Sequence, residues 1–239
     1  MNLDVELRTR LTAIESRIQA ACDRAHRVRK DVTLIAVSKT VTADVAKVVS
    51  RLGVKDFGES RPQEIWKKSA AIPQMRWHLI GHLQRNKLDK TIPMVSLVHS
   101  VDSERVLNAL SDFGMGRGLP VPILLEINCS REESKGGISP DDAAKMGDMA
   151  MSLPGVHFEG LMTMAAYGEN PEESRPTFVE LRQIRDQLRT SIGLKLPHLS
   201  MGMSNDFEVA IEEGSTYVRV GSTLFGGLGE KAEQTSSLQ

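Results

Sequence analysis

The sequence has little cysteine, no excess of charge of either sign and no long apolar run, and each absence excludes a class of protein. Only Cys22 and Cys129 occur among 239 residues, too few for the disulfide framework that stabilises small secreted domains. The 30 Lys and Arg residues nearly balance the 31 Asp and Glu residues, so no overall field attracts nucleic acid or an anionic membrane surface. No apolar run reaches membrane-spanning length, and the acidic start of the chain lacks a signal-peptide core. We therefore expect a cytoplasmic protein with no nucleic-acid or membrane partner.

The chain does contain an alternation of short β-rich runs with segments of helical composition. Apolar residues recur at intervals of three and four from Leu3 to Ala21, which predicts an amphipathic helix over residues 2–29. Strands that alternate with helices pair in parallel, and eight of them favour a closed barrel over an open doubly wound sheet. The predicted strands are residues 32–37, 54–57, 76–80, 94–99, 121–127, 156–162, 197–200 and 216–220, and the helices between them are residues 43–52, 61–71, 103–113, 140–153, 171–192 and 205–213, with a weak helical pattern at 86–91.

These elements predict an α/β fold, a single (β/α)8 TIM-like barrel with an extra N-terminal helix packed on it. The barrel and this helix together are expected to form one domain over residues 1–228. Residues 229–239 are polar enough to form a flexible tail. No second domain is indicated by any linker or repeat.

Lys39 is the first candidate for chemistry, because reactive side chains of a β/α barrel lie where the strands end. It follows the apolar run Leu34–Val37 and Ser38. Its amine is therefore expected at the mouth of a buried strand, where lost hydration makes it a better nucleophile for forming an imine. A solvated lysine that merely ends a strand is the alternative.

Two segments near the end of the chain have the composition of a phosphate site. Ser200–Asp206 follows the seventh predicted strand, and Gly221–Thr223 follows the eighth. Small residues let backbone amides approach phosphate oxygens, and hydroxyl groups add hydrogen-bond donors. Taken singly, each segment is compatible with a tight turn or a helix cap. Their joint placement on one face of the barrel favours phosphate binding.

Arg219 lies near the end of the last predicted strand, two residues before Gly221. A ligand whose phosphate lies on Gly221–Thr223 would extend its ring toward Lys39, and Arg219 would then meet the ring nitrogen. A guanidinium only donates hydrogen bonds, so it disfavours a protonated pyridine and weakens the ring as an electron sink. A structural pairing of Arg219 with Glu59 or Glu126 is equally compatible with the sequence.

An ordered set of segments, which covers most of the chain, resembles the YggS/PROSC-type pyridoxal phosphate homeostasis proteins, a family related to the N-terminal barrel of alanine racemase (PLP fold type III). The segments that carry the resemblance are Ala36–Lys39, Phe57–Ser60, Trp77–Lys87, Gly160–Met164, Leu199–Ser204 and Val218–Thr223. The resemblance implies pyridoxal 5′-phosphate (PLP) as the cofactor. It also implies that Lys39 holds PLP as an aldimine, that Arg219 faces the pyridine nitrogen, and that the phosphate is surrounded by Ser200, Ser204, Gly221, Ser222 and Thr223.

Two positions add detail to this resemblance. Ser60 occurs where the family often has Asn, near the expected ring hydroxyl, which a serine can reach directly or through water. Lys135 matches a family lysine that could accept PLP secondarily, although a solvated loop lysine is the favoured interpretation.

Two other candidate chemistries are disfavoured. His78 and His82 are four residues apart, but Gly81 lies between them and no acidic or cysteine partner has ligand spacing, so no metal site is predicted. Cys129 lacks an identifiable histidine and orienting carboxylate, so we expect a small buried thiol and no nucleophile.

The resemblance implies a PLP carrier without catalytic turnover. The related racemases use a second base, a tyrosine from another domain, which neither Tyr167 nor Tyr217 matches in position. We expect the protein to serve PLP (vitamin B6) and amino-acid homeostasis by holding PLP and delivering it to apo-enzymes, as a monomer or a weak homodimer. The alternatives are a PLP-dependent enzyme such as a weak amino-acid racemase, and a barrel aldolase in which Lys39 forms an imine with a sugar phosphate. A pure interaction module is disfavoured.

Overall fold

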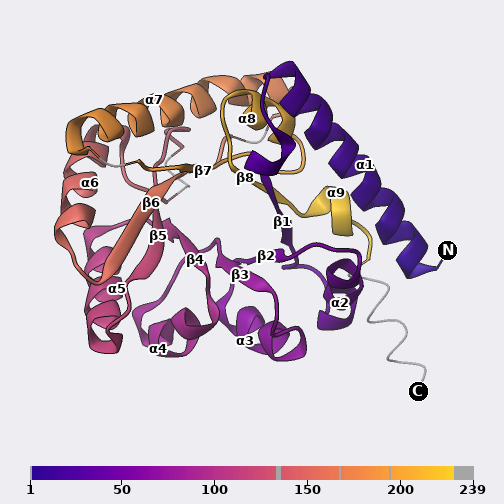
Figure 1. Cartoon of the computed structure of the whole chain (residues 1–239), viewed down its shortest axis with the longest axis horizontal. Coiled ribbons are helices and arrows are strands. Elements are labelled where there is room, and N and C mark those ends of the chain that lie inside the picture. Colours follow the sequence, from indigo (N-terminus) through magenta and orange to yellow (C-terminus); the bar gives the residue numbers. More distant parts are fainter. Residues whose placement is uncertain (1, 133–135, 167, 194, 229–239) are drawn as a thin grey trace.

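Eight parallel strands close into a barrel and follow one another around it in chain order (Figure 1). The computed structural model describes residues 2–132, 136–166, 168–193 and 195–228. Parallel pairing of the first strand with the last completes the circle. The strands are β1 (Thr33–Val37), β2 (Asp56–Glu59), β3 (Arg76–Leu79), β4 (Leu97–Val101), β5 (Val121–Glu126), β6 (Val156–Met162), β7 (His198–Ser200) and β8 (Tyr217–Val220).

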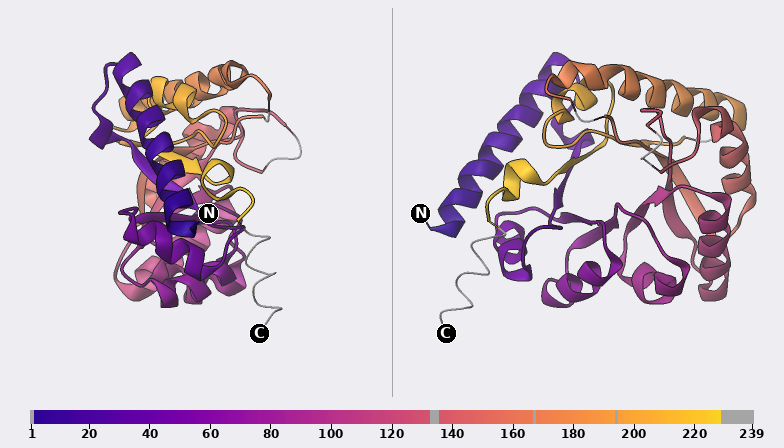
Figure 2. Two further views of the ribbon diagram at one scale, coloured as in Figure 1. Left: turned by 90° about the vertical axis from the view of Figure 1, so that its right-hand side faces the viewer. Right: turned by 180° about the vertical axis from the view of Figure 1, so that it is seen from behind.

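Helices between the strands surround the barrel, as Figure 1 and the right-hand view of Figure 2 show. All eight predicted strands and the six predicted helices are confirmed within a few residues, whereas the short helix after β8 was not predicted. The connection at residues 86–91 is a single helical turn between two 3-10 turns, Arg85–Lys87 and Ile92–Met94. The helices are α1 (Leu3–Arg24), α2 (Ala43–Arg51), α3 (Pro62–Ala71), α4 (Leu88–Thr91), α5 (Glu104–Arg117), α6 (Ala143–Ser152), α7 (Arg175–Ile192), α8 (Phe207–Glu212) and α9 (Ser222–Phe225), and further 3-10 turns are Arg29–Asp31, Pro140–Asp142 and Pro171–Ser174.

Helix α1 lies on the outside of the barrel and covers α8 and α9 (Figure 2). Its buried stripe includes Leu7, Leu11, Ile14 and Ile18, which is the periodic pattern that predicted the helix. The predicted end at residue 29 is wrong. The helix ends at Arg24, because Ala25 caps it and His26 adopts a left-handed backbone with a φ of 52°.

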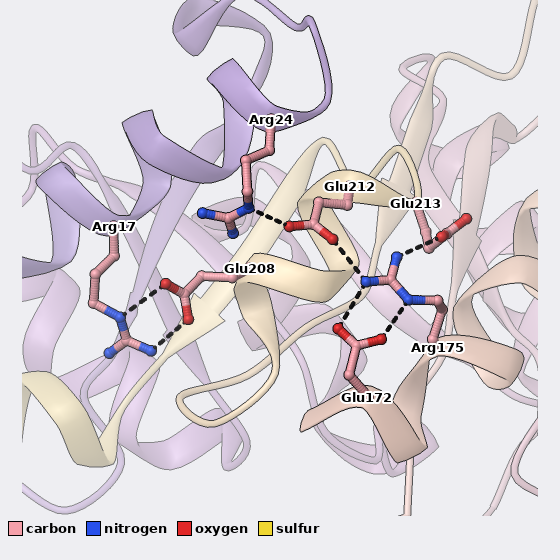
Figure 3. Close-up of polar contacts among 7 residues, drawn as sticks. All are labelled: Arg17, Arg24, Glu172, Arg175, Glu208, Glu212 and Glu213. Atoms are coloured by element: carbon pink, nitrogen blue, oxygen red, sulfur yellow. Dashed lines mark hydrogen bonds and ion pairs between the residues drawn. The ribbon is translucent and has the colours of Figure 1, made fainter. Parts of the chain in front are cut away.

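An ion-pair cluster fastens α1 and α7 to α8 (Figure 3). Arg17 pairs with Glu208 at 2.8 Å, and Arg24 pairs with Glu212 at 2.7 Å. Arg175 at the start of α7 contacts Glu212 as well. The cluster is partly exposed, so each pair stabilises the fold only modestly, but together they fix the helix that follows β7. The remaining contacts of Arg175 are to Glu172 and Glu213.

The interior of the barrel combines apolar and polar side chains. Leu97, Leu124 and Met162 form a small apolar cluster that is separate from the main core between strands and helices. His78, His99, Ser200 and Arg219 are also buried there, each at most 3% exposed. Because barrel interiors are usually filled by branched apolar residues, this polar content points to a functional role for the interior.

Two predictions concern the extent of the fold. The predicted tail at 229–239 lies outside the described residues, and the division into one domain over 1–228 stays a prediction. Within the described ranges, no helix is both long and apolar enough to cross a bilayer.

Candidate functional site

A cavity of about 270 Å³ opens at the carboxyl ends of the strands, close to the lower limit of typical ligand pockets, about 300 to 1,000 Å³. Six of the eight predicted site residues line it, whereas Ser200 and Thr223 do not. Residues from the loops after β1, β2, β6, β7 and β8 therefore meet at one place, as expected for this face of a β/α barrel. The six lining residues are Lys39, Ser60, Ser204, Arg219, Gly221 and Ser222.

Lys39 extends from the end of β1 and lines this cavity. It is exposed, so the expectation that the strand end desolvates its amine is wrong. The reason is that burial ends with Ser38, the residue before it. Among the described residues, none forms a hydrogen bond or ion pair with the Lys39 ammonium, which leaves the amine available to a ligand.

A buried ion pair fixes the backbone immediately before Lys39. Lys68 Nζ lies 2.6 Å from Glu59 Oε1 and donates to the Ser38 carbonyl at 2.7 Å. The Ser38 hydroxyl donates to the same carboxylate oxygen at 2.6 Å. Lys68 is 2% exposed and Glu59 is fully buried. This pair therefore holds both the main chain and the side chain of the residue that positions Lys39.

The two predicted phosphate loops are joined directly by hydrogen bonds. Ser204 Oγ accepts from the backbone amides of Gly221 at 3.2 Å and Thr223 at 3.3 Å. The Thr223 hydroxyl donates back to the Ser204 carbonyl at 3.3 Å. Thr223 thus supports the loop from outside the cavity, while Ser204, Gly221 and Ser222 face the cavity.

Asp206 was not singled out from the sequence, yet it lines the cavity and organises the loop after β7. Its carboxylate accepts from the Met203 amide at 2.6 Å and from the Ser174 hydroxyl at 3.0 Å. The Ser174 contact links the loop to the segment that precedes α7. An Asp before a short helix is typical of a cap, so the sequence carried no sign of this tertiary role.

Arg219 lies at the base of the cavity and is 3% exposed. Its guanidinium donates to Ser200 Oγ at 2.5 Å and to the Thr163 carbonyl at 2.9 Å. Burial lowers the pKa of Arg219 to about 10, so the group is still a cation at neutral pH. In the described part of the chain it forms no ion pair with Glu59 or Glu126, which argues against the structural pairing left open by the sequence.

Ser200 and Ser60 lie at different depths. Ser200 is fully buried, and its hydroxyl contacts both Arg219 and His99. Ser60 is half-buried on the cavity wall. A Cβ on Gly81 would lie 2.5 Å from the Ser60 carbonyl oxygen, so the close approach of the loops after β2 and β3 requires glycine at this position.

The two histidines with metal-like spacing occupy different environments. His78 is buried and contacts Asp56 and His99, whereas His82 is exposed and contacts Asp102 at 3.3 Å. In the described part of the chain, no group of three or more potential metal-ligating side chains converges. The lack of a metal stays a prediction.

The remaining candidates lie away from the cavity or outside the described residues. Burial raises the pKa of Cys129 to about 12, so this thiol stays protonated and unreactive at neutral pH. Tyr217 packs against His78 and His99 inside the barrel. Lys135 and Tyr167 lie outside the described residues.

Comparisons with known proteins agree with the geometry of this site. The family model described as "Alanine racemase, N-terminal domain" matches residues 9–229. A protein of Aquifex aeolicus named pyridoxal phosphate homeostasis protein is 42% identical over 219 residues, which cover 91% of this chain and 96% of that protein. The chain belongs to the pyridoxal phosphate homeostasis protein family.

Solved structures of other proteins share the fold of this chain. PipY of Synechococcus elongatus, solved with PLP bound, is 32% identical with a TM-score of 0.80, and the match covers 92% of this chain and all of PipY. Alanine racemase of Clostridium difficile has a TM-score of 0.73 at 16% identity, and the match covers 92% of this chain and 55% of the racemase. The racemase comparison confirms the predicted fold class alone.

Removing one partner of the buried ion pair tests how much Lys68 contributes to the fold. We expect Lys68→Met to lower the free energy of unfolding by about 3 to 5 kcal/mol, because it leaves Glu59 buried without its cation. Urea unfolding of Lys67→Met is the matched control, since that neighbouring side chain is 74% exposed and its loss changes stability by about 0.5 kcal/mol or less. Equal effects of the two substitutions would contradict this role for Lys68.

Glu126 at the end of β5 makes the stability of the fold depend on pH. Burial, with a smaller contribution from Asp102, raises the pKa of Glu126 to about 7. Between about pH 4.5 and pH 7, the Glu126 carboxyl is protonated in the folded state but has lost its proton in the unfolded state. The free energy of unfolding therefore falls as the pH rises through this range. We expect Glu126→Gln to stabilise the fold at pH 8 by up to about 3 kcal/mol and much less at pH 5.

Urea unfolding at pH 5 and pH 8 measures this difference. Glu104→Gln is the control, because that carboxylate is half exposed. Its removal should change the free energy of unfolding by the same amount at pH 5 and at pH 8. A gain from Glu126→Gln that does not grow with pH would contradict the assignment.

Proposed function

We propose that this protein binds PLP in the cavity at the end of the barrel and serves intracellular PLP and amino-acid homeostasis as a carrier. The observation that carries the proposal is the convergence of three groups on one cavity. These are the amine of Lys39, to which no described residue bonds, the buried guanidinium of Arg219 and the joined loops at Ser204 and Gly221. The name of the Aquifex aeolicus relative and the PLP-bound PipY structure support it.

The residues present fit this cofactor. The amine of Lys39 can attack the PLP aldehyde and form a covalent C=N bond with loss of water. Arg219 offers only hydrogen-bond donors, which suits an unprotonated ring nitrogen. Ser204 and Ser222 line the cavity and can offer hydroxyl groups to a phosphate, Gly221 lets the backbone approach it, and Ser60 supplies a hydroxyl for the ring. Ser200 and Thr223 are assigned to the same surroundings by the resemblance alone.

Bound PLP would supply an electron sink for amino-acid chemistry, but the protein groups around this cavity favour storage over turnover. A cationic Arg219 disfavours protonation of the pyridine and so weakens that sink. Tyr217, the only described tyrosine, packs against His78 and His99 in the barrel interior and does not line the cavity. We therefore propose no catalytic turnover. Weak racemase activity is the outcome that would overturn this part of the proposal.

The partners and location follow from the same proposal. A carrier releases PLP to apo-enzymes that require it, and it acts as a monomer or a weak homodimer. Both described cysteines are buried and unpaired, which suits the reducing conditions of the cytoplasm.

The covalent attachment can be tested by visible absorption. We expect the wild type incubated with PLP to absorb in the visible range and to carry a pyridoxyl group on Lys39 after borohydride reduction, located by peptide mapping. Lys39→Ala should lose both signals, because no other amine lines the cavity among the described residues.

Lys135→Ala is the matched control, since Lys135 is the other lysine that could accept PLP. It should keep the absorption and the Lys39 adduct. A wild type that stays colourless with PLP would contradict the proposal and favour the sugar-phosphate aldolase. An adduct found on Lys135 and not on Lys39 would also contradict it.

A further inference from the structure

Five hydrogen-bonded side chains cross the interior of the barrel and end at Arg219. They come from β2, β3, β4, β7 and β8, so most of the barrel wall contributes to them. We call this set the interior chain. Its contacts are Asp56 Oδ1 to His78 Nε2 at 2.9 Å, His78 Nδ1 to His99 Nε2 at 2.9 Å, His99 Nδ1 to Ser200 Oγ at 2.8 Å and Ser200 Oγ to Arg219 Nη1 at 2.5 Å.

The interior chain is buried along its whole length. Its members are between 0 and 6% exposed, so each polar group would be costly without its partner. At the far end, Arg76 donates to both carboxylate oxygens of Asp56 at 2.8 and 2.6 Å, and the Arg76 side chain is 60% exposed. The interior chain therefore connects the amino-terminal end of the barrel to the cavity at the other end.

The two ends of the interior chain fix where its protons lie when both imidazole rings are neutral. A carboxylate only accepts and a guanidinium only donates. His78 must therefore donate from Nε2 to Asp56, which leaves its Nδ1 to accept from His99 when the ring is neutral. His99 then accepts at Nδ1 from the Ser200 hydroxyl, and Ser200 accepts from Arg219. With both rings neutral, only one arrangement satisfies every contact, and it places the proton on Nε2 of both histidines.

The environment of His99 agrees with this arrangement. Burial, followed by the electrostatic influence of His78, Arg219 and His198, lowers the pKa of His99 well below its ordinary value. Tyr217 packs against both rings of the chain, with centroids 5.6 and 5.5 Å away. Neutral His99 is the form that can accept from Ser200. The other charged groups that act on Arg219 are Glu126 and Asp206, both of which favour its cation.

We propose that His99 and Ser200, supported by His78 and Asp56, are positioning residues that hold Arg219 in place to face a ligand's ring nitrogen. The interior chain supplies Arg219 with an uncharged acceptor where a carboxylate would neutralise it, while the carboxylate of Asp56, at the opposite end of the barrel, is paired with Arg76. The Ser200 proton is committed to His99, so Ser200 acts through Arg219 and does not donate to the ligand. This inference rests on the proposed function for its ligand, whereas the proton order does not.

The proton order can be measured without PLP. Long-range ¹⁵N NMR of histidine-labelled, ligand-free protein at pH 7 should show His99 neutral with its proton on Nε2, and a proton on Nε2 of His78 facing Asp56. Ser200→Ala should change the Nδ1 signal of His99 more than that of His198, whose ring lies outside the chain. A proton on Nδ1 of His78 or His99 at pH 7 would overturn the assignment, whatever the outcome for PLP.

The positioning role is tested by PLP binding to matched variants. His99→Leu and Ser200→Ala should each weaken PLP binding by about tenfold or more and shift the pH midpoint of the visible absorption of the bound cofactor. His99→Gln should recover most of the affinity and the wild-type midpoint. Its amide presents a donor and an acceptor on one carbon, as the imidazole does.

His198→Leu is the control, because His198 also packs on Tyr217, with ring centroids 4.7 Å apart, but among the described residues it forms no hydrogen bond with a member of the interior chain. It should leave the affinity and the midpoint within about twofold of the wild type. Wild-type affinity and midpoint in both His99→Leu and Ser200→Ala would overturn the positioning role. If His99→Leu does not fold, Ser200→Ala decides the question alone.

Discussion

The parallel pairing of β1 with β8 is the contact on which the site depends. It joins the two ends of the chain and sets Ile35 beside Arg219 and Ala36 beside Val220. Lys39 follows the first of these strands, and Gly221–Thr223 follows the second. Barrel closure thus brings the amine to the guanidinium and the glycine loop, although about 180 residues separate them in the sequence.

Polar groups placed in and under the cavity give this barrel its particular chemistry. The Glu59–Lys68 pair fixes Ser38 beneath Lys39, and the contacts of Ser200 and Thr163 fix Arg219. Such groups stabilise a fold little when compared with apolar residues of similar volume, but they restrict it to one arrangement. In the part of the chain that the structure describes, nothing bonds to the Lys39 amine at the cavity wall, whereas the Arg219 cation at its base is held on two sides. This asymmetry suits a site that forms a covalent bond to the ligand at Lys39 and a hydrogen bond to the ligand's ring nitrogen at Arg219.

Much of the fold and part of the site were predictable from the sequence because their signals are local. The alternation of apolar runs and helical segments predicted the barrel, and strand ends indicated Lys39, Ser204 and Gly221. The end of α1 was not predictable in this way, since Arg27 leaves the helix to donate to the carbonyl oxygens of Ile211 and Ser215, far along the chain.

The polar contacts behind the site could not be predicted, because they depend on how strands from distant parts of the sequence are staggered. His99 and Ser200 are 101 residues apart, and Lys68 and Ser38 are 30 residues apart. Each of these residues, taken alone, is compatible with an ordinary surface or core position. Ser200 looks like a phosphate contact from its loop, and only the folded barrel shows its hydroxyl between Arg219 and His99.

A crystal structure of the protein grown with PLP tests the central claim most directly. The account predicts continuous electron density from Lys39 Nζ to the cofactor, the ring nitrogen within hydrogen-bond distance of Arg219, and the phosphate beside Ser204 and Gly221. PLP bound elsewhere, or bound in this cavity with its phosphate at Arg219, would contradict the account.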